Sequence, residues 1–267
     1  MRQRLIAIFG VVATIGIWWL LAATVFASVG ARPDGTGGAI PTPYAVFQQL
    51  MADGFDFYLR NGSVTLSEAA IGFFWGNLGA VLLAGVAVSL PRVENLATQI
   101  AIITYCIPVV AIGPIVRLIV GAPSEGEPAG SAIVLAALSV FFTTTVGVLT
   151  GIKSADRASL EIVTAYGGSR FTRLVKVQII SALPSTIAAL RIAAPAAFLG
   201  AILGEYVGGP DLGFGPAMVN AQQSLEIERV WGVALVSGLI AGAGYALFGL
   251  IARLVTPWST GTGKLAA

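Results

Sequence analysis

Five long segments of this chain contain no charged residue, and their length restricts them to helices in a lipid bilayer. They cover residues 5–29, 69–90, 96–116, 131–152 and 230–252. Roughly 20 apolar residues in a helix cross the hydrocarbon core, where every backbone group must be paired internally. A sixth apolar region, 183–207, has Arg191 near one end and Glu205 near the other, where charged side chains reach the interface. The sequence therefore predicts an all-α membrane protein with six transmembrane helices.

The composition agrees with a membrane protein and excludes several kinds of chemistry. Only 10% of the residues are charged and 56% are hydrophobic, whereas soluble domains carry about 25% charged residues. The chain has no histidine, which removes histidine-based acid–base catalysis, histidine metal ligands and a Ser-His-Asp triad. The one cysteine, Cys106, builds neither a disulfide framework nor a zinc site. A net charge of +2 is too small to indicate nucleic-acid binding.

The sequence also offers no energy source of its own. No segment matches the phosphate-binding loop pattern G-x-x-x-x-G-K-[ST]; the nearest, Gly261-Thr262-Gly263-Lys264, lacks its spacing and the preceding strand. Arg191 and Glu205 are the only acidic or basic side chains predicted within a span, which is too few for a proton relay. If this protein transports a solute, the energy comes from elsewhere.

Lysine and arginine in the connecting segments predict the orientation of the chain. The first apolar run follows Met-Arg-Gln-Arg but is too long for a typical signal peptide, so we expect a retained first helix. With the N-terminus inside, the inside segments hold Arg2, Arg4, Arg92, Lys153, Arg157, Arg170, Arg173, Lys176, Arg253 and Lys264. The outside segments then hold Arg32, Arg60, Arg117 and Arg229. The excess of basic residues inside predicts that both termini are cytoplasmic.

The inside segment 153–182 is the most polar part of the chain, and its pattern predicts two short helices. Leu160, Val163 and Tyr166 recur about every three residues, which indicates an amphipathic helix. Gly167 and Gly168 then break the helix. We expect a second helix after a Ser169 cap, and Pro184 in the first turn of the fifth span. The pattern alone is also compatible with a basic loop lying on anionic lipid.

Prolines and glycines within the spans suggest hinges and close helix packing. Pro108, Pro114 and Pro195 interrupt backbone hydrogen bonds, so they mark either path-lining hinges or tolerated packing kinks. Tyr105 lies one turn before Pro108. Small residues let helices approach closely. We expect such close helix contacts at Gly72, Gly76, Gly79, Gly238 and Gly242. Arg191 and Glu205 are costly within a span, which favours a functional or interface role.

Several of these segments together resemble the permeases of bacterial binding-protein-dependent ABC importers. Glu161, Gly167 and Leu183-Pro184 match the frame of the family's EAA loop. The sequence ALRIAAPAAFLGAILGEYVGGPDLGFG, which follows this loop, resembles the sulfonate, taurine, nitrate and thiamine-precursor branch of the family. The segments IPTPYAVFQQL and YCIPVVAIGPIV resemble the outer segment and third span of that branch. The resemblance extends over residues 40–258; Ile162, Val163 and Ile180 depart from the usual loop residues.

The resemblance implies the permease fold of a type I ABC importer. It implies a first helix (1–29), a periplasmic segment (30–67), a permease domain (68–256) with the coupling loop 153–182, and a cytoplasmic tail (257–267). The ATPase-coupling residues would be Leu160, Glu161, Val163, Thr164, Ala165, Tyr166, Gly167, Gly168 and Arg170. The candidate translocation path would include Tyr105, Pro108, Pro114, Arg191, Pro195, Phe198 and Glu205.

The same resemblance implies a non-catalytic subunit in the bacterial inner membrane. Its partners would be a cytoplasmic ABC ATPase dimer, a solute-binding protein outside and a second permease, identical or homologous. The chain itself would bind no cofactor, because ATP and Mg²⁺ would sit on the ATPase. The solute would be a small organic anion, such as a sulfonate, or a heterocyclic precursor.

Other classes of membrane protein remain open at this point. An ion-gradient-driven secondary transporter would need coupling carboxylates inside the spans, for which the sequence offers only Glu205. A membrane enzyme would need a nucleophile with a base or a metal site. A passive structural subunit would have no effect on solute uptake.

Overall fold

The computed structural model describes residues 2–30, 38–90, 94–123, 127–209 and 211–260, and these residues form helices and turns without any strand. The helices, in chain order, are α1 (Arg2–Ala23), α2 (Pro43–Ser89), α3 (Glu94–Cys106), α4 (Val109–Val120), α5 (Gly130–Lys153), α6 (Arg157–Ala165), α7 (Arg170–Arg173), α8 (Ile179–Gly208), α9 (Phe214–Gln223) and α10 (Ile227–Val255). A π turn, Leu174–Gln178, joins α7 to α8, and a 3₁₀ turn, Pro257–Thr260, follows α10. The all-α fold predicted from the sequence is confirmed.

Four helical segments are long and apolar enough to cross a membrane: α2, α5, the continuous helix 170–208 and α10. Helices α3 and α4 together form a fifth apolar segment, broken by a bend of 94°. The described apolar stretch of α1, Ile8–Ala23, is shorter. The structure thus contains four spans, or five with the bent pair, and the sixth stays a prediction.

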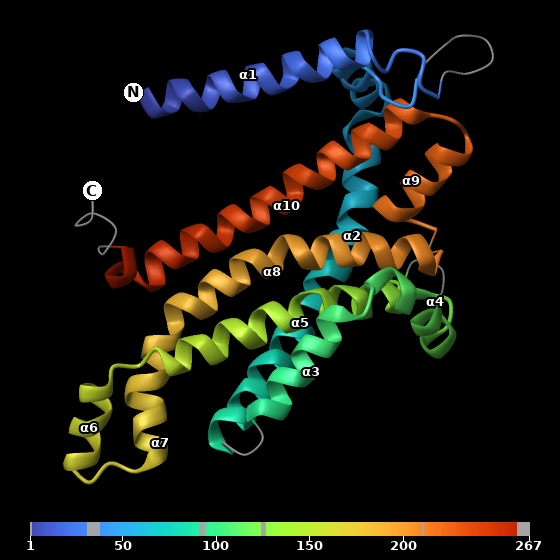
Figure 1. Cartoon of the computed structure of the whole chain (residues 1–267). Helices are drawn as coiled ribbons and strands as arrows, with labels where there is room; N and C mark the ends of the chain where they lie inside the picture. The colour runs from blue at the N-terminus through green and yellow to red at the C-terminus, as the bar shows by residue number, and fades with distance from the viewer. Residues whose placement is uncertain (1, 31–37, 91–93, 124–126, 210, 261–267) are drawn as a thin grey trace.

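The helices form one elongated bundle with two different ends (Figure 1). Helix α5 packs along α8 and also against α2, and α10 lies on the other side of α8. At one end α6 and α7 project from the bundle; we call this the α6 end. Helices α4 and α9, and the starts of α2 and α10, lie at the opposite end, the α9 end. The start of α1 and the end of α10 both point toward the α6 end.

Small residues bring α5, α8 and α2 into close contact. A Cβ added at Gly204 on α8 would lie 2.7 Å from the carbonyl oxygen of Ser131 on α5. A Cβ added at Gly72 on α2 would lie 2.6 Å from the carbonyl oxygen of Ile133. The packing expected of Gly72 is confirmed. Gly238 and Gly242 meet nothing within 4 Å, so the packing expected of them is wrong within this subunit.

Helix α2 is much longer than the second span predicted from residues 69–90. Thr42 caps its start by accepting a hydrogen bond from the Ala45 N–H at 3.3 Å, and Pro43 occupies the first turn. The helix is interrupted at Gly54, whose φ of 74° lies in the left-handed region. Much of the segment predicted as an outside connection (30–67) is therefore helix. The apolar pattern marked only its membrane part, because residues 43–67 are too polar.

Three further details correct or extend the sequence reading. The predicted break at Pro108 is confirmed, since this residue caps α4. Pro184 lies inside a continuous helix and not in its first turn, because the helix that starts at Arg170 runs on through the π turn. The glycine-rich segment after the fifth span contains α9. Arg32, Arg92, Lys264 and the tail beyond 260 lie outside the described residues.

The close approach of α8 to α5 predicts a large effect of a single methyl group. We expect Gly204→Ala to lower the free energy of unfolding by about 1–3 kcal/mol, because the added Cβ would overlap the α5 backbone. Thermal unfolding of the purified chain in mild detergent measures the change. The matched variant Gly242→Ala adds the same methyl group in open space, so it should leave stability unchanged or raise it by up to about 1 kcal/mol. Equal melting temperatures for the two variants would contradict the packing.

Candidate functional site

Helix α6 begins at a capping carboxylate. Asp156 accepts hydrogen bonds from the backbone N–H and the hydroxyl of Ser159, both at 3.0 Å. The bond from the Ser159 N–H stabilises the ionised form and holds the pKa of the exposed Asp156 carboxyl below its usual range. The carboxylate also faces the positive end of the helix dipole. The first turn of α6 is therefore well defined at neutral pH.

Helix α6 ends in two glycines that turn the chain sharply. Gly167 has a φ of 76°, which a glycine adopts without strain. The Gly168 N–H donates to the Val163 carbonyl at 2.8 Å, and the Gly167 N–H donates to the Thr164 carbonyl at 2.9 Å. These two bonds define a Schellman motif. A Cβ added at Gly168 would lie 2.5 Å from Val163 Cγ1, so this position needs a glycine for space. The predicted break in the helix is confirmed.

The outer side of α6 is an exposed apolar surface. None of its nine residues is buried. Ile162 is 58% exposed and Tyr166, which caps the helix, is 89% exposed. Residues four apart share one face of a helix, so these two side chains form one patch. Leu160 and Val163 are only half-exposed. The three-residue spacing of Leu160, Val163 and Tyr166 predicts an apolar face without Ile162. The four-residue spacing from Ile162 to Tyr166 is the signal that identifies the exposed patch.

The other predicted coupling residues lie around this patch, on the surface of the α6 end. The exposed ones are Glu161, Thr164, Ala165, Gly167 and Arg170. The Ser169 cap is confirmed, because its hydroxyl accepts a hydrogen bond from the Thr172 N–H at 3.2 Å. Phe171, which the sequence reading did not include in the site, is 72% exposed. The segment thus presents apolar and basic side chains together.

A cavity of about 460 Å³ opens between this segment and the end of α2. It is lined by Val88, Ser89, Leu160, Arg170, Phe171, Arg173, Leu174 and Gln178. Two of these residues are arginines and none is acidic. The α6 end therefore carries a hollowed, basic surface beside the exposed patch of α6.

The structure does not bring the predicted path residues together at one surface. Tyr105 is 68% exposed on α3 and stacks on Phe142, with ring centroids 4.5 Å apart. Phe198 and Glu205 are buried in the core of the subunit. The Arg191 guanidinium lies 4.0 Å from the centre of the Tyr245 ring. These side chains therefore lie in different environments, exposed on α3, buried in the core or stacked on an aromatic ring, and do not line one common surface.

The remaining predicted path residues are prolines. Pro108 caps α4 and Pro114 lies inside it, whereas Pro195 lies inside α8. The role of all seven residues in a path stays a prediction.

The core of the helix bundle contains an acidic residue that the sequence pattern does not predict. Glu68 lies on α2 just before the predicted second span, and its side chain is fully buried. Thr65, one turn before it on α2, donates a hydrogen bond to Glu205, so the bundle contains two neighbouring buried carboxyl groups where only one was expected. The pattern of apolar residues could not reveal this, because Glu68 borders the charge-free run and the contact joins residues far apart in the sequence.

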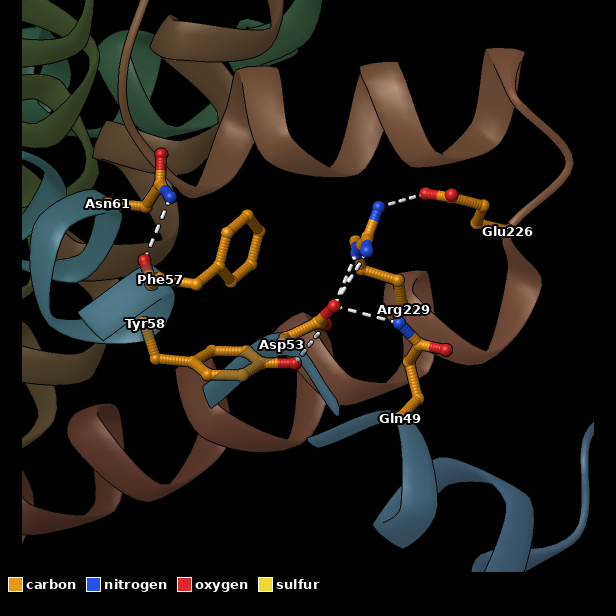
Figure 2. A network of polar contacts seen from close by, with 7 residues as sticks. All are labelled: Gln49, Asp53, Phe57, Tyr58, Asn61, Glu226 and Arg229. Atoms are coloured by element: carbon orange, nitrogen blue, oxygen red, sulfur yellow. Dashed lines mark hydrogen bonds and ion pairs between the residues drawn. The ribbon is translucent and has the colours of Figure 1, made fainter. Parts of the chain in front are cut away.

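The α9 end contains a second cavity, of about 540 Å³, with a polar network at its wall (Figure 2). Arg229 on α10 binds Asp53 on α2 through its Nη2, at 2.7 Å, and through its Nε, at 2.9 Å. Asp53 also accepts hydrogen bonds from Tyr58, at 3.0 Å, and Gln49, at 2.8 Å. Arg229 binds Glu226 as well. This network fastens the first part of α2 to the start of α10.

The cavity itself has charges of both signs. It is lined by Asp53, Asp56, Phe57, Arg60, Asn61, Asp211, Leu212, Ala217, Asn220, Ala221, Ser224, Glu226 and Arg229. Within the described residues, no group of three or more potential ligands could hold a metal ion. The arrangement can bind polar groups by charge and hydrogen bonds.

Comparisons with known proteins show which family has this sequence and fold. Residues 76–260 match the model of the family "Binding-protein-dependent transport system inner membrane component". A probable ABC transporter permease protein of Haemophilus influenzae is 28% identical over 88% of this chain and 91% of its own length. The formylaminopyrimidine transport permease protein ThiX of Halalkalibacterium halodurans is 25% identical over 90% of this chain and 94% of its own. The riboflavin transport system permease protein RibX of Chloroflexus aurantiacus is 29% identical over 90% of this chain and 88% of its own.

The fold has a close match among solved structures. A chain of the MetNI methionine ABC transporter in an inward-facing conformation superposes with a TM-score of 0.63, over 75% of this chain and 96% of that chain, at 18% identity. At this identity the likeness shows a shared fold only. The family membership rests on the family model, which matches more than half of the sequence. The long apolar helices, the projecting α6 and the family match agree: this chain belongs to the binding-protein-dependent transport system inner membrane components and is a permease subunit of an ABC importer.

Proposed function

We propose that this permease moves a small solute inward and is driven through α6 by a separate cytoplasmic ABC ATPase. In this proposal two permease subunits surround the path, and each α6 docks into a groove of one ATPase. A solute-binding protein delivers the solute at the α9 end. ATP and Mg²⁺ bind the ATPase and not this chain.

The exposed face of α6 is the observation that carries the proposal. A nine-residue helix without a buried residue gains little stability from its own subunit. Its two ends are nevertheless fixed, by the Asp156 cap and by the glycine turn. An exposed apolar patch on a short, well-capped helix is suited to insertion into a hydrophobic groove of a partner.

The connection from α6 into the membrane supports a mechanical role. After the glycine turn, the chain forms one continuous helix from Arg170 to Gly208. A displacement of α6 by the ATPase is thus passed to α8, which packs on α5 along its length. Closure of the two ATPases would draw the two α6 helices together and open the path outward, and ATP hydrolysis would reverse this.

The distribution of basic residues supports a cytoplasmic α6 end. Arginine and lysine are enriched in cytoplasmic segments of membrane proteins. The described basic residues at or near this end are Lys153, Arg157, Arg170, Arg173, Lys176 and Arg253. Those nearer the α9 end are Arg60, Arg117 and Arg229. In this orientation both termini are cytoplasmic, in a bacterial inner membrane.

Exposed apolar side chains support an assembly with a second permease. On α3 and α4, Tyr105 is 68%, Leu118 86% and Ile119 79% exposed. We propose that this bent pair of helices faces the partner permease, identical or homologous. Two relatives are named for formylaminopyrimidine and riboflavin transport, so small heterocyclic compounds are the first class of solute to test.

Removal of the apolar patch on α6 should uncouple the permease from its ATPase. Both side chains are exposed in the subunit, so Ile162→Ser with Tyr166→Ser should leave its folding unchanged. Each side chain buried in a partner groove contributes about 1.5–3 kcal/mol, so the double variant should bind the ATPase at least about tenfold more weakly. Co-purification of the ATPase in mild detergent and solute uptake measure the effect.

The control for this experiment is Met51→Ser, which removes another exposed apolar side chain, from the first part of α2. It should leave ATPase binding intact. Uptake that persists in the double variant, or in cells without the ATPase, would contradict the coupling role and favour transport driven by an ion gradient.

The left-handed conformation of Gly167 predicts an order among its substitutions. Gly167→Val should abolish ATP-driven uptake, because a β-branched residue is strained by about 1–2 kcal/mol or more in this conformation. Gly167→Asn should retain most of the uptake, because asparagine tolerates it. No atom lies within 4 Å of the added Cβ, so the comparison tests the backbone conformation and not a steric clash. Equal uptake by both variants would show that the turn is dispensable.

Labelling of single cysteines tests the proposed orientation. In a Cys106→Ala background, Ala158→Cys on α6 and Ser224→Cys after α9 are both at exposed positions. A membrane-impermeant maleimide should label the second variant in intact cells, and the first only after the membrane is opened. The reverse pattern would invert the topology.

A further inference from the structure

Two buried carboxyl groups lie close together near the α9 end of the bundle. Glu68 on α2 is 0% exposed and Glu205 on α8 is 1% exposed. Thr65, one turn before Glu68 on α2, donates its hydroxyl hydrogen bond to Glu205. The start of α5 reaches both residues, because the Ala129 N–H donates to Glu68 and the Ser131 hydroxyl donates to the carbonyl of Gly204, next to Glu205. The two carboxyl groups lie where α2, the start of α5, the end of α8 and the start of α9 meet. Neither the family match nor the proposed coupling role explains why these two carboxyl groups are buried together.

The hydrogen bonds around the two carboxyl groups are unequal. Glu205 accepts two bonds, one to Oε1 from the Thr65 hydroxyl and one to Oε2 from the Gly215 N–H, both at 2.6 Å. Glu68 accepts one bond on Oε1, from the Ala129 N–H at 2.5 Å. No protein donor reaches Glu68 Oε2 from the described residues. This oxygen is therefore the one that lacks a partner unless it carries a hydrogen itself.

No cation among the described residues neutralises the pair. The basic residues on the elements around it are Arg60 on α2, which is exposed, Arg117 on α4, Lys153 on α5 and Arg191 on α8. The other ionisable groups there are Tyr44, Asp53, Asp56 and Tyr58 on α2, Tyr206 on α8 and Asp211 before α9. Arg117 donates to the Val207 carbonyl at 2.8 Å, and Tyr206 donates to Gln222. Arg191 and Lys153 lie toward the other end of their helices. Two adjacent buried carboxylates cannot both be ionised without such a partner.

We propose that Glu68 and Glu205 share one proton, which resides on Glu68 Oε2 and is donated to an ionised Glu205. The assignment follows from the donors. Glu205 receives two hydrogen bonds besides this one, and its carboxylate binds the Gly215 N–H in the first turn of α9, where the helix dipole stabilises an anion. An O–H···O⁻ bond of this kind is strong because the acceptor is charged.

The shared proton fixes the connection between α8 and α9. The chain there passes so close to Glu205 that a Cβ at Gly213 would lie 2.5 Å from its Oε1. The Phe214 N–H is bound by the Thr65 hydroxyl at 2.9 Å, and the Gly213 N–H by Asn61 at 3.2 Å. Glu68 thus acts as a positioning residue. It holds Glu205, which holds the start of α9 and with it one wall of the cavity at this end.

Two isosteric variants test whether the proton lies on Glu68, on Glu205 or on neither. Glu68→Gln should keep the melting temperature of the detergent-purified chain, because the amide N–H replaces the O–H and the amide oxygen still accepts from Ala129. Glu205→Gln should lower it by roughly 3–10 °C, because one amide oxygen cannot accept from both Thr65 and Gly215. Glu161→Gln, on the exposed surface of α6, is the control for the loss of a carboxylate and should keep the melting temperature of the wild type.

Infrared spectroscopy detects the proposed proton directly, through the carbonyl stretch of a protonated carboxyl group. A purely structural role of Glu68 would not predict this band. The wild type should show the carbonyl stretch of a buried protonated carboxylic acid, with a shift in D₂O. Glu68→Gln should lack this band, and Glu161→Gln should keep it. A missing band in the wild type, or a Glu68→Gln variant that is more stable, would show that both groups are ionised. A tolerated Glu205→Gln with a destabilising or non-folding Glu68→Gln would place the proton on Glu205. Each of these results overturns the proposal.

Discussion

A chain inside a bilayer has to satisfy its polar groups from within, and the central bundle of this permease follows from that constraint. Its backbone is paired within long helices, and its helices are held by close contact because lipid offers no hydrophobic gain for their association. Glycine and alanine on α5, α8 and α2 make this contact possible. The three helices form a compact centre, to which the two differently built ends are attached.

The two ends of the bundle use polar groups in opposite ways. At the α9 end, polar side chains are turned inward, as in the bonds between Asp53 and Arg229 and around Glu205, and they lock loops to helices. At the α6 end, the apolar side chains of Ile162 and Tyr166 are turned outward. The α9 end is held together by its own polar contacts, whereas the α6 end exposes apolar side chains that a partner can cover. The α6 end is therefore the one suited to receive force from a partner protein.

The sequence predicted most of what depends on local pattern. Charge-free runs located the membrane part of α2, α5 and α10, and Gly167 marked the turn after α6, because each signal lies within a few neighbouring residues. Contacts between distant residues were not predictable in this way. Glu68 was missed because its partner lies 137 positions further along the chain. Gly238 and Gly242 looked like packing positions, but a single sequence does not show which face of α10 meets a neighbour.

The interruption at Gly54 divides α2 into two parts, and both parts are tied to α10. Before the break Asp53 binds Arg229, and after it the Phe73 ring lies 5.3 Å from the Phe248 ring of α10. The Tyr58 hydroxyl also donates a hydrogen bond to Asp53 across the break, at 3.0 Å. The left-handed glycine is therefore a braced elbow, and a tilt of α10 would carry the outer rim and the membrane part of α2 in the same direction.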